Sequence, residues 1–138
     1  MPIFKRVHHV SVSIDRPPAD VYAYAAEPAN LPRWAAGLST STAIRAEGDA
    51  LVVDSPMGTV RVQFVPRNAL GVLDHDVILP SGEVVHNPLR VIANASGSEV
   101  VFTIYQRPGM SADDLARDVA AVEADLRALA RLLDAVPA

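Results

Sequence analysis

The chain has 138 residues, of which half are hydrophobic and a fifth are charged, and these values predict a single globular domain over residues 1–138. Twelve basic and sixteen acidic residues give a formal net charge of -4, too weak a field to attract nucleic acid or an anionic membrane. The sequence lacks cysteine, which excludes disulfides, thiolate metal ligands and a cysteine nucleophile.

The first residues, 1–6, lack the basic and apolar pattern of a secretory signal. No window of the sequence approaches the roughly 20 apolar residues that are needed to span a bilayer. We therefore expect a cytoplasmic protein that does not insert into membranes.

The predicted elements begin with a strand over 7–14, where polar and apolar residues alternate. Two prolines, Pro17 and Pro18, follow, and Pro18 can occupy the first turn of a helix because its missing N–H is not needed there. A short helix is predicted over 19–26, and a second helical turn is predicted over 29–34.

Six further strands are predicted by segments rich in β-branched and alternating residues. They are 42–46, 51–55, 59–65, 70–79, 84–94 and 99–106. The turns between them carry Gly, Pro, Asn, Asp or Ser, which favour chain reversal. Because each connection is too short for a parallel crossover, the sheet is predicted to be antiparallel.

The last predicted element is a long amphipathic helix over 111–135, whose apolar residues are spaced by three and four. They are Leu115, Val119, Val122, Leu126, Leu129, Leu132 and Leu133. Ser111 and Asp114 approximate a capping box at the helix start, and Glu123 can pair with Arg127 one turn later.

This order of elements indicates an α+β fold rather than an α/β fold. A sheet of about seven twisted antiparallel strands curls, and one helix lying in its concave face can bury an apolar stripe without filling the whole volume. We therefore predict an apolar cavity between the long helix and the sheet.

Three segments, VSVSI at 10–14, RPPADVY at 16–22 and EPANLPRW at 27–34, together with the C-terminal helix, resemble the helix-grip (SRPBCC) superfamily. That group includes START lipid-transfer domains, the birch-pollen allergen group, ubiquinone-binding proteins and the polyketide cyclase/dehydratase group. The resemblance implies the order β-α-α-β6-α and a deep apolar pocket. It implies no particular reaction, because one scaffold carries many functions.

The hairpin around 80–82 predicts which side chains enter this pocket. If its turn centres on Ser81, His75 and Asn87 face each other and share the inward, apolar parity of their strands. Asp76 then faces His86 on the outer side. Asp74 and Arg90 are expected in the same solvent-side charge cluster.

The predicted ligand-contacting residues share the inward parity or lie near the pocket mouth. They are Trp34, Val62, Phe64, His75, Val77, Asn87, Leu89, Phe102 and Tyr105. On the last strand, either Phe102 with Ile104 or Tyr105 faces inward. Trp34 either stacks on a ligand or plugs the gap between the short helices and the sheet.

His75 is the one candidate catalytic residue, because imidazole titrates near neutral pH and can act as a general acid or base. The alternative is a structural core histidine that is held by Asn87. The adjacent His8 and His9 point to opposite faces of a strand, and the sequence contains neither a zinc-binding helix spacing nor a glycine-rich nucleotide motif. We expect neither a metal nor a cofactor.

These observations predict binding or carriage of a small hydrophobic molecule, which could be a lipid, a polyketide-like compound or an aromatic compound. One alternative is an enzyme of the cyclase/dehydratase type that uses His75 as general acid or base. Another is a protein-interaction module that resembles co-chaperone relatives. Homodimerisation through an edge strand is left open.

Overall fold

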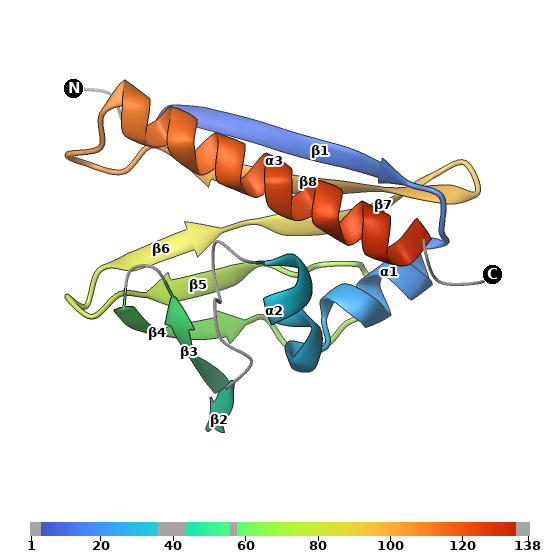
Figure 1. Cartoon of the computed structure of the whole chain (residues 1–138), viewed down its shortest axis with the longest axis horizontal. Coiled ribbons are helices and arrows are strands. Elements are labelled where there is room, and N and C mark those ends of the chain that lie inside the picture. Colours follow the sequence, from blue (N-terminus) through green and yellow to red (C-terminus); the bar gives the residue numbers. More distant parts are fainter. Residues whose placement is uncertain (1–3, 36–43, 56–57, 135–138) are drawn as a thin grey trace.

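The computed structural model describes residues 4–35, 44–55 and 58–134 of the chain. Within these residues, eight strands form two antiparallel sheets, and the long C-terminal helix α3 lies across the strands β1 and β8 (Figure 1). The α+β class predicted from the order of elements is therefore confirmed. Across the same residues, no helix is long and apolar enough to span a bilayer.

The smaller sheet pairs the first strand of the chain with its last two strands. It contains β1 (Val7–Ile14), β8 (Gly97–Tyr105) and β7 (Leu89–Asn94) in the order β1-β8-β7. The β1 strand shows the predicted alternation, because Val10 and Ile14 are buried whereas Ser11 and Ser13 are exposed. This face of the sheet carries the main hydrophobic core.

The larger sheet is a meander with the order β2-β3-β4-β5-β6. Its strands are β2 (Arg45–Glu47), β3 (Ala50–Ser55), β4 (Gly58–Phe64), β5 (His75–Ile78) and β6 (Val84–Asn87). The turn after β5 centres on Ser81, so His75 faces Asn87 and Asp76 faces His86, as predicted. Parts of the predicted strand 42–46 and of the turn at 56–58 lie outside the described residues.

Pro88 divides one predicted strand into β6 and β7, so the hairpin that this strand forms with residues 70–79 runs from one sheet into the other. The register continues past this division, because the Leu73 N–H donates to the Leu89 carbonyl at 2.8 Å. That register places Asp74 opposite Pro88, whose nitrogen has no hydrogen to donate to the ladder. The division explains why the described chain has eight strands rather than about seven.

The helices close one side of the sheets. The short ones are α1 (Pro18–Ala25), a 3-10 turn at Pro28–Asn30 and α2 (Leu31–Trp34). The long one is α3 (Ala112–Asp134), which packs on β1, β8 and α2.

The start of α3 forms the predicted capping box. The Asp114 N–H donates to Ser111 Oγ at 3.0 Å, and the Ser111 N–H donates to Asp114 Oδ2 at 3.1 Å. One turn past the middle of the helix, Arg127 donates to Glu123 at 3.0 Å, as predicted from their spacing. The capping box fixes where α3 begins.

Candidate functional site

The buried apolar stripe of α3 is interrupted over residues 116–125. Leu115 and Leu126 are buried, but all residues between 116 and 125 are half-buried or exposed. Asp118 and Val122 fall on the line between these two leucines, at the three- and four-residue steps of a buried stripe. The helix therefore does not fill the space beneath this segment.

A cavity of about 150 Å³ lies beneath the interruption. It is lined by Leu31, Trp34 and Ala35 at the end of α2, by Phe64, His75, Phe102 and Ile104 from the strands, and by Asp118, Ala121, Val122 and Asp125 from α3. A cavity of this size holds about one six-membered ring. The interior between α3 and the sheets is thus not completely packed.

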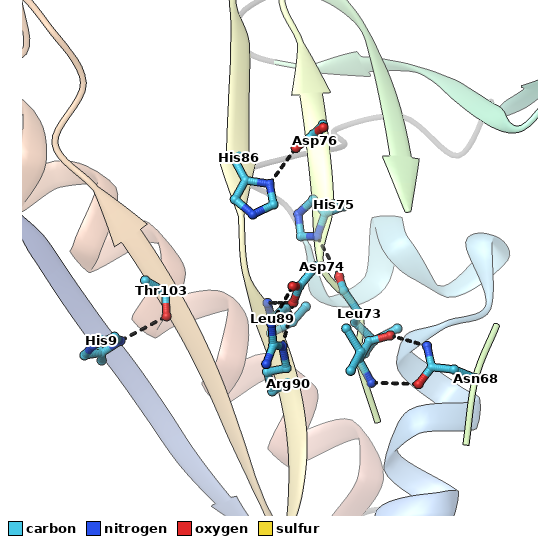
Figure 2. A network of polar contacts seen from close by, with 11 residues as sticks. His9, Asn68, Leu73, Asp74, His75, Asp76, His86, Leu89, Arg90 and Thr103 are labelled. Carbon is cyan, nitrogen blue, oxygen red and sulfur yellow. Dashed lines mark hydrogen bonds and ion pairs between the residues drawn. The ribbon is translucent and has the colours of Figure 1, made fainter. Parts of the chain in front are cut away.

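His75 is the polar side chain that the sheet supplies to this cavity, and it is only 6% exposed. Its Nδ1 lies 3.0 Å from the Leu73 carbonyl oxygen (Figure 2). Because a carbonyl can only accept, Nδ1 carries the hydrogen, and Nε2 of the neutral ring is left as an acceptor. Nε2 is not among the fully buried atoms that lack a partner in the described residues. The structural alternative for His75 assigned this bond to Asn87, whose amide instead approaches the Val85 carbonyl.

Two aromatic rings hold the imidazole of His75 in place. The Phe64 ring lies 4.7 Å from it, and the Phe102 ring meets it edge-on at 5.9 Å. Burial lowers the pKa of His75, although the hydrogen bond to Leu73 and the nearby Asp74 and Asp76 raise it in part. His75 is therefore neutral at neutral pH and offers a lone pair in apolar surroundings.

The facing wall, on α3, carries two carboxyl groups, Asp118 and Asp125. Burial raises the pKa of Asp118, with Arg107 opposing the rise and Asp114 adding to it. A carboxyl whose charge is disfavoured in this way can protonate more readily than an exposed one. The cavity thus pairs a neutral imidazole with a partly desolvated carboxyl group.

Trp34 forms part of the third wall, at the end of α2, and is 4% exposed. Its indole Nε1 is buried and is the only such side-chain nitrogen or oxygen without a hydrogen-bond partner in the described part of the chain. Buried polar groups are almost always paired in native proteins. This N–H is therefore a fully buried donor without a partner in the described part of the chain.

Four of the nine predicted ligand-contacting residues line this cavity, namely Trp34, Phe64, His75 and Phe102. The even-numbered residues of β8 face inward, so Phe102 and Ile104 line it together. Tyr105 lies on the other face of that strand, where its ring stacks on His86 at 6.5 Å.

The remaining predicted residues lie deeper in the sheets or further along them. Val62 and Val77 belong to a separate buried cluster on the larger sheet, and Leu89 is 1% exposed in the main core. Asn87 is half-buried on β6. Strand parity identifies the inward face correctly for these positions, but it gives no information about where α3 leaves space.

A second cavity, of about 370 Å³, adjoins the same region beneath α1. Val62 and Phe64 line it together with Tyr22, Ala26, Pro28, Asp49, Leu51, Gln63, Val65, Pro66, Arg67 and Leu73. Phe64 borders both cavities. Phe64 is therefore shared by the walls of the two cavities.

Sequence reasoning missed the contribution of α3 to the cavity. Asp118 lies three residues after Leu115, and Asp125 lies four residues before Leu129, so both occupy positions of the apolar stripe. An acidic residue at such a position is the signal that could have located the cavity, because a fully packed helix would carry an apolar residue there.

Asp74 and Asp76 flank His75 in the sequence and make the charged contacts of the hairpin, with Arg90 and His86 respectively (Figure 2). Arg90 binds Asp74 through two nitrogens at 2.9 and 2.7 Å, and the Leu89 N–H donates to the same carboxylate at 2.9 Å. The Arg90 guanidinium holds the pKa of Asp74 below its usual value. Asp74 is 9% exposed, so it is not the solvent-side residue that was predicted, whereas the predicted pairing of Asp76 with His86 is present at 2.7 Å.

The family model described as polyketide cyclase / dehydrase and lipid transport matches residues 7–135 of the chain. No protein with a curated description matches the sequence. Among solved structures, XoxI from Bacillus cereus has a TM-score of 0.74 at 14% identity, covering 94% of this chain and 96% of that chain. The Aha1 dimer from Colwellia psychrerythraea has a TM-score of 0.75 at 12% identity, covering 94% and 97%.

DynU16, a protein in the dynemicin biosynthetic locus, has a TM-score of 0.73 at 19% identity. The comparison covers 94% of this chain but 47% of DynU16, so the chain spans about half of that protein. At these identities the likeness shows the fold. It agrees with the long helix held against curved antiparallel strands (Figure 1) and confirms the helix-grip architecture predicted from the sequence.

Proposed function

Because the chain belongs to the polyketide cyclase / dehydrase and lipid transport family, we propose that it binds a small, mainly apolar molecule in the cavity between α3 and the sheets. The observation that carries this proposal is the incomplete packing beneath residues 116–125 of α3. Affinity would come from apolar surface removed from water, at about 25 cal/mol per Å².

The volume of the cavity limits the size of its occupant. About 150 Å³ accommodates one ring, whereas pockets for larger ligands enclose roughly 300 to 1,000 Å³. The ligand is therefore a ring-sized molecule or the ring-sized part of a larger one. A larger ligand would extend past Phe64 into the neighbouring cavity of about 370 Å³.

His75 orients this ligand. Its Nδ1 is held by the Leu73 carbonyl, so Nε2 accepts a hydrogen bond from a ligand hydroxyl. A phenol should therefore bind more tightly than toluene, which has a methyl group in place of the hydroxyl. The preference should be about tenfold, since a buried hydrogen bond contributes roughly 1 kcal/mol and an unpaired acceptor costs more.

The test is a titration of the protein with toluene and phenol, followed by NMR, in two matched variants. Val122→Phe places a larger side chain in the cavity, and Val101→Phe makes the same change on the outward face of β8. We expect Val122→Phe to abolish binding of both probes and Val101→Phe to retain it. If the native protein binds neither probe, or if Val122→Phe binds both normally, the cavity is not the binding site.

A second candidate function is acid–base catalysis of the cyclase/dehydratase type. It is favoured because a neutral imidazole, that of His75, and a carboxyl group with a raised pKa, that of Asp118, line one cavity. His75 would take a proton from the carbon next to a ligand carbonyl and leave an enolate. The protonated His75, after exchanging with solvent, or a protonated Asp118 would then return a proton to that carbon. In D₂O this step exchanges the methyl hydrogens of acetophenone for deuterium.

Exchange that exceeds the buffer rate and is lost in His75→Gln would favour the enzyme. Binding of acetophenone at the buffer rate of exchange would favour a carrier. His8→Gln is the matched control, because His8 is exposed on β1 and lies outside the cavity. It should exchange as the native protein does.

A further inference from the structure

We propose that the cavity beneath α3 binds a protonated amine attached to a ring-sized apolar body, and that the carboxylate of Asp118 receives the ammonium group. This inference rests on the proposed function, because it names the chemical class of the ligand in the same cavity. It adds a requirement for positive charge and for hydrogen-bond donors, which apolar binding alone does not impose.

Asp118 lies on the face of α3 that borders the cavity. It follows Leu115 by three residues and precedes Val122 by four, so the three side chains share one face of the helix. Leu115 is buried, and both Asp118 and Val122 line the cavity. An ionisable group therefore takes a position at which the rest of the stripe is apolar.

The carboxyl group of Asp118 forms no hydrogen bond or ion pair with another described residue. Arg107 and Arg117 act on it only through longer-range charge interactions, and each has a partner of its own. Arg107 binds Glu83 at 3.0 Å, and Arg117 binds Asp114. Burial raises the pKa of Asp118 because its charge loses contact with water. A cation bound beside Asp118 would therefore stabilise the ionised carboxylate.

The polar groups that a ligand meets in this cavity are acceptors. The buried ring of His75 donates through Nδ1 to the Leu73 carbonyl, which leaves Nε2 to accept. The carboxylates of Asp118 and Asp125 also accept. The Trp34 indole N–H is a donor, but its nitrogen has less than 1 Å² of accessible surface, so a ligand does not reach it. An ammonium group, with three N–H donors, matches this set of acceptors.

The same lining favours positive over negative charge in a ligand. Its ionisable members among the described residues are His75, Asp118 and Asp125, and His75 is neutral at neutral pH because burial lowers its pKa. An anionic ligand would lose its hydration without meeting a cation in the described lining. An ammonium group instead meets a carboxylate that compensates for the lost water.

The spacing along α3 indicates the shape of the ligand. Asp118 and Val122 are four residues apart, which is about 6 Å along the helix axis. A ring beneath Val122, where Phe64 and Phe102 also line the cavity, thus needs a short arm to bring its ammonium group to Asp118. Asp118 is half-buried, so the ammonium group keeps part of its hydration there. Benzylamine has this shape and a ring that fits a cavity of about 150 Å³.

The experiment compares three probes that share a benzene ring and differ in charge, namely benzylamine, benzyl alcohol and benzoate. They are titrated at about pH 7, where an alkylamine is protonated, and binding is followed by NMR. We expect benzylamine to bind about tenfold more tightly than benzyl alcohol, because a charge-assisted hydrogen bond is stronger than a neutral one. Benzoate should bind most weakly. Only benzylamine should lower the pKa of Asp118, as measured from the chemical shift of its carboxyl carbon.

Two matched variants test the role of the carboxylate. Asp118→Asn removes the charge and keeps the shape, so the preference for benzylamine should fall to about twofold or less while benzyl alcohol still binds. Asp113→Asn removes the same charge from the exposed first turn of α3, outside the cavity lining, and should keep the preference of about tenfold. Val122→Phe fills the cavity and should abolish binding of both probes.

Equal affinity of the native protein for benzylamine and benzyl alcohol would overturn the selection of amines and leave apolar binding intact. A preference for benzylamine that persists in Asp118→Asn would overturn the role of this carboxylate. Benzylamine that still binds Val122→Phe would be attracted by the net charge of -4 rather than by the cavity, which would also overturn the inference. Failure of all three probes to bind the native protein would overturn the proposed function together with this inference.

Discussion

The two halves of α3 lie against the same sheets but bury very different surfaces. In the C-terminal half, Leu126, Leu129 and Leu133 are at most 4% exposed and belong to the main core. In the preceding half, the corresponding positions are taken by Asp118 and Val122, which border a cavity. One helix thus serves as a packed support at one end and as a cavity wall at the other.

The difference shows how this fold can be stable and still leave space for a ligand. The packed half fixes α3 against β1, so the other half can stand away from the strands without detaching. Burial of leucine side chains contributes roughly 1.5 to 3 kcal/mol each, which offsets the poorer packing around the cavity. Stability and the proposed binding therefore involve different turns of one helix.

The strongest test of this comparison is truncation in each half. Leu129 is fully buried, so Leu129→Ala should lower the free energy of unfolding by about 2 to 5 kcal/mol. Val122 already borders empty space, so Val122→Ala should cost about 1 kcal/mol or less. Urea denaturation measures both values. Similar losses for the two variants would show that the cavity region is packed as tightly as the core.

The second test uses the histidine that faces the cavity. Burial lowers the pKa of His75 in the folded state below the usual imidazole value of about 6.5, so the unfolded chain binds a proton more readily. The stability contribution of neutral His75 is complete above pH 6.5 and is lost as the pH falls toward the folded-state pKa. The slope approaches about 1.4 kcal/mol per pH unit in that window.

The unfolding free energy, measured at a series of pH values from about 7.5 to about 5, tests this dependence. His75→Gln should remove most of the acid-side loss, whereas His8→Gln, at an exposed position on β1, should retain it. An unchanged slope in His75→Gln would mean that the imidazole is hydrated in the folded protein.

Sequence reasoning predicted the fold well because its signals are local. Alternation in β1, the turn centred on Ser81 and the capping box at Ser111 each depend on a few neighbouring residues, and each is present in the structure. The division of the sheet at Pro88 was missed, although proline within a predicted strand is a known signal of an interrupted ladder.

The site was less accessible to sequence reasoning because a cavity is a property of distant contacts. Parity placed His75 on the inward face and left Phe102 open against Tyr105. It treated Val77 and Leu89 in the same way as His75, although these two are packed in the cores. Which inward residues border space depends on where α3 carries small or acidic residues. That information comes from combining the helix with the strands, as the position of Asp118 shows.

The smallest expected effect comes from Asp118 itself. Burial raises the folded-state pKa of Asp118 above the usual value of an aspartate carboxyl group, so the ionised carboxyl destabilises the fold. Stability therefore falls as the pH rises from the unfolded-state pKa through the folded-state pKa. Asp118→Asn removes the charge and should raise the unfolding free energy at pH 7 by a few tenths of a kcal/mol, since solvent screens a half-exposed group. The gain should shrink as the pH falls through about 4 and be largely gone near pH 3.5, where most of the carboxyl group is protonated in both states.

Asp15→Asn is the control for this last effect, because Asp15 is exposed in the bend after β1 and carries the same change of charge. The gain in unfolding free energy of Asp118→Asn should exceed that of Asp15→Asn at about pH 7 and approach it at about pH 3.5. This result would assign the effect to burial beside the cavity. Equal gains at both pH values would assign it to the net charge of -4 instead. Asp118 would then be an ordinary surface carboxylate, and the functional contrast between the two halves of α3 would rest on its apolar residues alone.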